Sequence, residues 1–132
     1  MNWGRILLIA VGLAFTPYGL LCLVDPELPA GYAGMALSDA SARTEVAAMY
    51  GGLQIGLGLL FIALALRKQT VTIGLAVLMS VMGSLALGRL YGLFAFGFST
   101  YNFLAFLFEI LSAVLAVVVL KRSSREGLPD AA

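Results

Sequence analysis

Residues 87–109 read LGRLYGLFAFGFSTYNFLAFLFE and join two apolar runs, each long enough to cross a membrane. The stretch places one arginine, Arg89, and one glutamate, Glu109, inside those runs. A charge held in lipid costs roughly 2.5–3.5 kcal/mol on insertion scales, so such a residue marks either a function or a paired structural site. The stretch therefore predicts two membrane helices with a polar cluster between them.

The composition supports a membrane protein. The chain has 132 residues, of which 61% are hydrophobic and 11% are charged, whereas average soluble domains are about 45–50% apolar and about 25% charged. A net charge of +1 gives no general attraction to nucleic acid. The chain has no His, and its one Cys, Cys22, lies in an apolar run as a small buried hydrophobe would. We therefore expect no metal, no cofactor and no catalytic residue of the usual kinds.

Four apolar runs approach the ~20 residues that cross ~30 Å of hydrocarbon. They cover about residues 6–24, 45–66, 71–94 and 101–120. We predict an all-α fold: a polytopic membrane protein with a compact bundle of four transmembrane helices over residues 1–122 and a short polar tail over 123–132. The first run is retained as a span, because it is longer than the ~7–15 residues of a signal-peptide core.

Residues 25–44 form the long polar connection. Pro26, Pro29, Gly31 and Gly34 are expected to break regular structure there. Three polar residues near its end are candidate N-caps of the second long helix, which would begin before the membrane: Ser38, Asp39 and Ser41.

Basic residues predict the orientation. If the chain crosses four times, one side carries Arg5, Arg67, Lys68, Lys121, Arg122 and Arg125. The other side carries only Arg43, among the acids Asp25, Glu27, Asp39 and Glu45. By the positive-inside rule both termini are cytoplasmic and the long loop lies outside.

Small residues recur at helical spacing. In the third span they are Ser80, Ser84, Gly88 and Gly92, and in the second they include Gly52 and Gly56. This small-xxx-small pattern lets helix backbones approach closely. The fourth span has one small or polar face of Asn102, Ala105, Glu109, Ser112 and Ala116. We interpret these stripes as packing seams, with a homo-oligomer contact left open for some of the glycines.

Arg89 and Glu109 are expected at similar depth in adjacent antiparallel helices. At ~1.5 Å per residue, Arg89 lies about 9 Å below Ala95, and Glu109 about 12 Å below Tyr101, within reach of an Arg side chain. A bidentate Arg–carboxylate pair would satisfy both charges. Further predicted members of the cluster are Glu45, Tyr50, Gln54, Tyr91 and Asn102. Tyr101 is interpreted as an interfacial anchor.

Three roles are open for this cluster: fixing helix register, binding a ligand or ion, or contacting a partner subunit. The segments TEVAAMYGGLQIGLGLLF and LGRLYGLFAFG, with the Glu of FLFEILSAVLA, resemble the small bacterial four-helix membrane proteins called domain of unknown function 4345. The resemblance implies an inner-membrane location, no established activity, and recurring residues at Gly51, Gly52, Gly56, Arg89 and Glu109. A fainter likeness to four-helix scaffold proteins of eukaryotic sterol synthesis favours a non-catalytic role.

The leading hypothesis is a non-catalytic accessory or scaffold protein, or a protein that binds a ligand from the lipid phase, with membrane lipid or another membrane subunit as partner and no nucleic acid. The alternative is a small proton-coupled transporter of the multidrug-exporter type that uses Glu109. A membrane enzyme with Glu and Tyr acid–base residues ranks third, because no spacing of these residue types is diagnostic.

Overall fold

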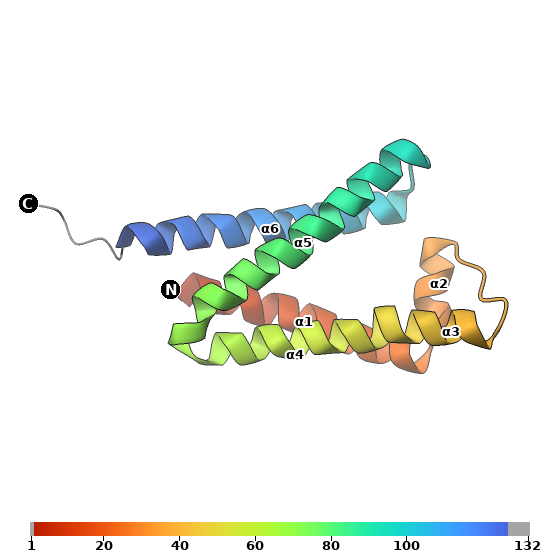
Figure 1. Ribbon diagram of the computed structural model, residues 1–132, viewed down its shortest axis with the longest axis horizontal. Coiled ribbons are helices and arrows are strands. Elements are labelled where there is room, and N and C mark those ends of the chain that lie inside the picture. The colour runs from red at the N-terminus through yellow and green to blue at the C-terminus, as the bar shows by residue number, and fades with distance from the viewer. Residues whose placement is uncertain (1, 127–132) are drawn as a thin grey trace, which may run out of the picture. The chain divides into compact units, whose positions relative to one another are not determined.

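The structure is a computed structural model that describes the backbone of residues 2–126 and the side chains up to Ser123. The long helices are α1 (Asn2–Val24), α4 (Leu53–Leu66), α5 (Val71–Ala95) and α6 (Thr100–Glu126) (Figure 1). A π-helical turn, η1 (Ala47–Gly52), joins α4 without a break to the short helix α3 (Ala40–Val46). The four helical segments long and apolar enough to cross a membrane are 2–24, 40–66, 68–95 and 100–123. The prediction of an all-helical chain with four such segments is thereby confirmed.

The long connection is more ordered than predicted. Pro26 lies between α1 and helix α2 (Glu27–Ala33), as expected, but the expectation that Pro29 and Gly31 break regular structure is wrong, because α2 includes both. Proline is tolerated in a first helical turn, where its missing N–H would have no partner in the helix. Gly34 then ends α2 in the left-handed conformation, at φ 69°, which glycine adopts without steric cost.

Asp39 is the N-cap of α3, as its position predicts. Its backbone is extended, and its carboxylate accepts a hydrogen bond from the backbone N–H of Ala42 at 2.8 Å. The helix begins at Ala40, before the apolar run at Glu45, also as predicted. At the other end of the chain, α6 continues to Glu126. The polar tail over residues 123–132 stays a prediction: its first four residues continue the helix, and residues 127–132 lie outside the described residues.

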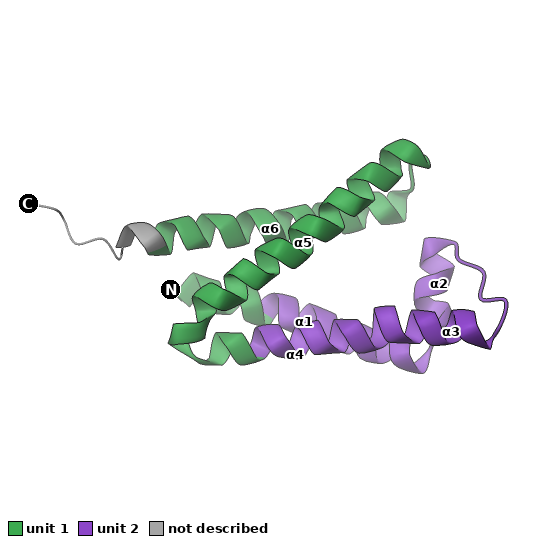
Figure 2. Ribbon diagram, viewed as in Figure 1, with its two compact units in different colours: residues 1–9, 63–132 green, residues 10–62 purple. Residues whose placement is uncertain are grey.

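The chain divides into two compact units (Figure 2): residues 10–62 form one, and residues 1–9 with 63–132 form the other. The single compact bundle stays a prediction. In the unit of residues 10–62, α1 packs closely on α4 and η1. A methyl group at Gly12 would lie 2.7 Å from the carbonyl oxygen of Gly58, and one at Gly19 would lie 2.9 Å from that of Gly51.

These glycines form two levels of one seam. Gly12 and Gly19 are seven residues apart on α1, and Gly51 and Gly58 are seven residues apart on the facing helical segment of η1 and α4. Seven residues are about two turns, so each pair lies on one face of its helix. Glycines at such positions let two backbones approach with no side chain between them. The ring of Phe61 fills the adjacent space, edge-on to Phe15 with 6.2 Å between ring centroids.

In the other unit, α5 and α6 run antiparallel and pack on each other. A turn at residues 96–99 joins them, with Gly97 at φ 103°. The side chain of Arg5 also belongs to this unit and donates a hydrogen bond from Nε to the carbonyl oxygen of Ala65 at 2.9 Å. A basic side chain is favourable there, because the last carbonyls of a helix lack N–H partners.

Large apolar side chains cover the outside of the long helices. Val24, Phe94 and Phe96 are each at least 84% exposed, and many leucines on all four helices are more than a third exposed. Exposed apolar surface on this scale is unfavourable in water, at about 25 cal/mol per Å². The helices therefore fit a small multi-pass membrane protein, whose lipid would cover this surface.

Candidate functional site

Arg89 follows the buried face of α5. The buried residues of α5 recur at helical spacing and include Leu75, Leu78, Met82 and Ala86. Arg89 comes three residues after Ala86, less than one turn further along the helix. The same periodicity that buries the apolar residues therefore turns the arginine toward α6.

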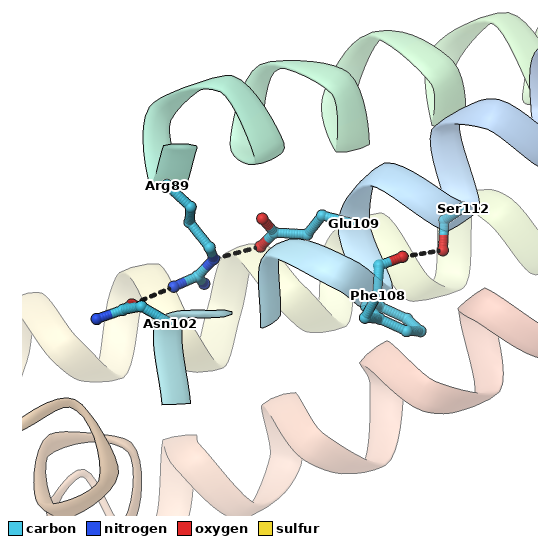
Figure 3. Close-up of polar contacts among 5 residues, drawn as sticks. All are labelled: Arg89, Asn102, Phe108, Glu109 and Ser112. Atoms are coloured by element: carbon cyan, nitrogen blue, oxygen red, sulfur yellow. Dashed lines mark hydrogen bonds and ion pairs between the residues drawn. The ribbon is translucent and has the colours of Figure 1, made fainter. Parts of the chain in front are cut away.

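The small and polar face of α6 receives it. Glu109, Ser112, Ala113 and Ala116 are all buried, and the first two are the only polar residues in the described core. Ser112 satisfies its hydroxyl locally, by donating a hydrogen bond to the carbonyl oxygen of Phe108 at 2.7 Å (Figure 3). Glu109 has no such local partner and depends on another helix.

Arg89 joins two residues of α6 (Figure 3). Its Nε donates to Oε1 of Glu109 at 2.7 Å, and its Nη1 donates to Oδ1 of Asn102 at 2.7 Å. The side chain of Glu109 is only 7% exposed, whereas that of Arg89 is 25% exposed. The geometry brings together Arg89, Glu109 and Asn102, three of the predicted cluster members. Arg89 divides its donors between a carboxylate and an amide, so the predicted bidentate pair with Glu109 is not what forms.

One carboxylate oxygen of Glu109 is not used. Oε2 is buried and has no hydrogen-bond partner among the described residues. A buried polar atom without a partner costs about 1–3 kcal/mol, so such an atom calls for an explanation. It can accept a hydrogen bond from a small molecule or hold a proton. The cluster therefore contains one hydrogen-bond acceptor, Oε2 of Glu109, that the described residues do not use.

Tyr101, and not the predicted Tyr91, lies beside the guanidinium of Arg89. The guanidinium carbon of Arg89 lies 5.9 Å from the centroid of the Tyr101 ring, within the range of a cation–π contact. Tyr91, a predicted member of the cluster, instead packs its ring edge-on against Phe96 and is 67% exposed. The sequence does place Tyr101 near the cluster, because it directly precedes Asn102 in the first turn of α6. Sequence position alone does not predict that the ring points toward Arg89.

The exposed side of Arg89 faces a pocket of about 540 Å³. Its polar lining consists of Arg89, Asn102, Ser99 and Ser84, and its other walls are Leu85, Gly88, Gly92, Leu93, Phe96, Gly97 and Phe98. Pockets that bind small molecules have volumes of about 300–1,000 Å³ and combine apolar walls with a few polar groups. The volume of this pocket lies within that range, and its lining combines polar and apolar groups.

Three residues of the predicted packing stripe of α5 line this pocket, namely Ser84, Gly88 and Gly92, and its two glycines are not packed against α6. A methyl group at Gly88 would meet nothing within 4 Å, and one at Gly92 would meet only the ring of Phe96. Ser80 and Ser84 are exposed. At about 100° per residue, Gly88 lies about 200° around the helix from Ala86, which explains why the two faces differ.

The second predicted stripe is also open. A methyl group at Gly52 or Gly56 would meet nothing within 4 Å, whereas Gly51 and Gly58, one or two residues away, are tightly packed. Within their own unit, the packing role therefore falls to Gly51 and Gly58. Gly52 and Gly56 stay candidates for a contact with a second molecule.

Glu45, Tyr50 and Gln54 belong to the unit of residues 10–62, and their predicted part in the cluster stays a prediction. Glu45 is exposed. The oxygen Oε1 of Gln54 is buried without a partner among the described residues, as is the hydroxyl of Thr16 in the same unit. Sequence reasoning missed Thr16 as a buried polar group, because a lone threonine in an apolar helix usually bonds its own backbone.

No three His, Cys, Asp or Glu side chains in the described part of the chain lie close enough to hold a metal ion. Cys22 is a free thiol, fully buried, as its apolar surroundings in the sequence predict. The chemistry of the site therefore comes from the guanidinium, the carboxylate and the amide.

Comparison with known families decides one further point. The family described as Domain of unknown function (DUF4345) matches residues 4–120. The chain belongs to this family. The DUF4345 match takes in all four long helices and the Arg89, Asn102 and Glu109 cluster, and it confirms the resemblance drawn from the sequence. A search of the curated proteins and of the solved structures finds no match. Since the description of DUF4345 gives no activity, function must be argued from the site.

Proposed function

We propose that this DUF4345 protein is a non-catalytic, multi-pass protein of the bacterial inner membrane that binds a ligand from the lipid phase through Arg89 and Asn102. The observation that carries the proposal is the position of Arg89: it is bonded to Glu109 on one side and lines an open pocket of about 540 Å³ on the other. A purely structural pair would have no need of that pocket. An accessory role beside another membrane subunit is compatible with the same site.

The orientation belongs to this proposal. Both termini are placed in the cytoplasm, because the positive-inside rule assigns the side rich in Lys and Arg to that compartment. The test uses a Cys22→Ser background with one new cysteine, either Ser38→Cys in the connection or Ser123→Cys near the end of α6. A membrane-impermeant maleimide applied to intact cells should label the first variant and not the second. The reverse pattern would overturn the orientation.

The binding role is tested by purification from native membranes. The wild-type protein should retain a stoichiometric lipid or partner subunit that native mass spectrometry identifies. The Arg89→Gln/Glu109→Gln double variant should lose it, because the guanidinium is replaced while a neutral hydrogen-bonded pair is kept. Recovery of neither lipid nor partner with the wild type would overturn the proposal.

A transporter is the second candidate, favoured by one observation: Oε2 of Glu109 is buried without a partner among the described residues and so has room for a proton. Arg89 already neutralises this glutamate, which argues against exchange of a cationic substrate for protons. Proton-coupled cation uptake by the wild-type protein in liposomes, abolished by Glu109→Gln, would reverse the ranking.

A further inference from the structure

We infer that the ligand is a glycerophospholipid, bound with its phosphodiester at Arg89 and Asn102 and one acyl chain running toward the membrane interior along Gly88 and Ser84 of α5. This inference rests on the proposed function and names the class of ligand. We call the face of α5 formed by Ser84, Gly88 and Gly92, together with the walls at Leu85, Leu93, Phe96 and Phe98, the α5 groove.

The head of the site is built from donors. Arg89 uses one N–H on Glu109 and one on Asn102, and its other N–H groups have no acceptor among the described residues. The amide of Asn102 accepts from Arg89 through Oδ1, which turns its NH₂ group toward other acceptors. Free donors around a guanidinium match the oxygens of a phosphate, which guanidinium binds through two parallel hydrogen bonds.

The Arg89–Glu109 pair limits how much negative charge a ligand beside it can carry. Glu109 lies against the same guanidinium and offsets its charge, so the arginine and glutamate together are neutral. A neutral pair offsets little of the charge of an anion, so a phosphodiester with one negative charge is easier to hold there than a group with two. A free inorganic phosphate carries more charge at neutral pH and has no apolar part to use the walls. The balance of charges therefore favours an esterified phosphate.

The α5 groove supplies the apolar half. Ser84, Gly88 and Gly92 stand four residues apart, so they follow one face of the helix for about 12 Å. Because a methyl group at Gly88 would meet nothing within 4 Å, the helix surface there is open. The leucines and phenylalanines of the lining form its sides. Ser84 and Gly88 lie on the membrane-interior side of Arg89, where an acyl chain would run, and Gly92 and Phe96 lie on the headgroup side.

The surroundings place the site where lipid headgroups lie. Phe96 and Phe98 on the α5–α6 turn are 84% and 72% exposed, and residues 90–108 contain no charged residue. A short turn between two helices that are each long enough to cross a membrane lies at the membrane interface. Arg89 lies about 9 Å below the end of α5, and a guanidinium at this depth extends toward the headgroups.

The test separates head, chain and site. Purified protein in dodecyl maltoside is mixed with phosphatidylglycerol, with diacylglycerol, or with inorganic phosphate, and bound ligand is counted by native mass spectrometry. Phosphatidylglycerol should bind the wild type at least about tenfold more tightly than diacylglycerol, which lacks the phosphate. Inorganic phosphate should not displace it. Equal retention of diacylglycerol, or displacement by phosphate alone, would overturn the inference.

Two variants locate the lipid. Gly88→Leu fills the groove without changing any charge, and Gly52→Leu is its matched control at another open helical glycine. The first should lower phosphatidylglycerol retention about tenfold, and the second should leave it unchanged. Equal retention by both variants would overturn the inference. Circular dichroism confirms that each variant is folded. A wild-type protein that holds a different ligand or a partner subunit refutes this inference alone, whereas one that holds nothing refutes the proposed function as well.

Discussion

Removing the charges of Arg89 and Glu109 one at a time should have unequal effects on the free energy of unfolding. The three variants are Arg89→Leu, Glu109→Leu and the double variant. Breaking a buried ion pair by removing one partner costs about 3–5 kcal/mol, because a buried charge is left uncompensated. The structure predicts which single variant loses more of its free energy of unfolding.

Arg89→Leu leaves the worse defect. The side chain of Glu109 is 7% exposed, and both of its oxygens would then lack a partner, since Oε2 already has none among the described residues. We expect a loss of about 3 kcal/mol. Glu109→Leu should cost less, about 1–2 kcal/mol, because Arg89 is 25% exposed and keeps its hydrogen bond to Asn102.

The double variant should recover most of the loss. Replacing a buried pair by apolar residues of similar volume is often neutral or stabilising, so its stability should lie within about 1 kcal/mol of the wild type. It should also retain no ligand. The measurement is SDS titration in mixed micelles followed by far-UV circular dichroism, analysed as a double-mutant cycle. Single losses that simply add in the double variant, or a larger loss for Glu109→Leu than for Arg89→Leu, would refute the reasoning.

Three further predictions concern the frame around the site. Gly58→Ala should destabilise the protein by about 1–3 kcal/mol, because its methyl group would lie 2.8 Å from a backbone nitrogen of α1. The matched control is Gly56→Ala, whose methyl group would meet nothing within 4 Å. It should be neutral or slightly stabilising in the same titration. Asp39→Ala should lower stability by about 1 kcal/mol through loss of the N-cap, and Asp39→Asn should retain most of it, measured in the same way. Arg5→Gln should cost about 1 kcal/mol, because the hydrogen bond to the carbonyl oxygen of Ala65 is lost, and faster hydrogen exchange at the end of α4 measured by mass spectrometry would locate the effect.

Local chemistry could be predicted where it depends on neighbours in the chain. Asp39 is followed by a helix whose first N–H groups need an acceptor, and the N-cap forms where the residue type predicts it. The same reasoning failed at Pro29. A proline fits the first turn of a helix but breaks the interior of one, and the sequence alone does not show that a helix begins at Glu27. The π-helical turn at Ala47–Gly52 carries no sequence signal that periodicity detects.

Glycine spacing predicted close packing but not its place. Gly52 and Gly56 have the small-xxx-small pattern and face open space, whereas Gly51 and Gly58 make the tight contacts with α1. The stripe at Gly88 and Gly92 likewise opens onto the pocket. A stripe of small residues states that a helix can be approached on that face, and the path of its neighbour decides whether it is.

The sequence alone determined that the chain is all helical, that four segments are long and apolar enough to cross a membrane, and that Arg89 and Glu109 lie at matching depths. Each of these follows from apolar run length and from the fixed rise of a helix. Only the tertiary structure decided that the guanidinium divides its donors between Glu109 and Asn102 and that it lines a pocket. Those outcomes depend on how far α5 and α6 are rotated about their axes, which no local spacing encodes.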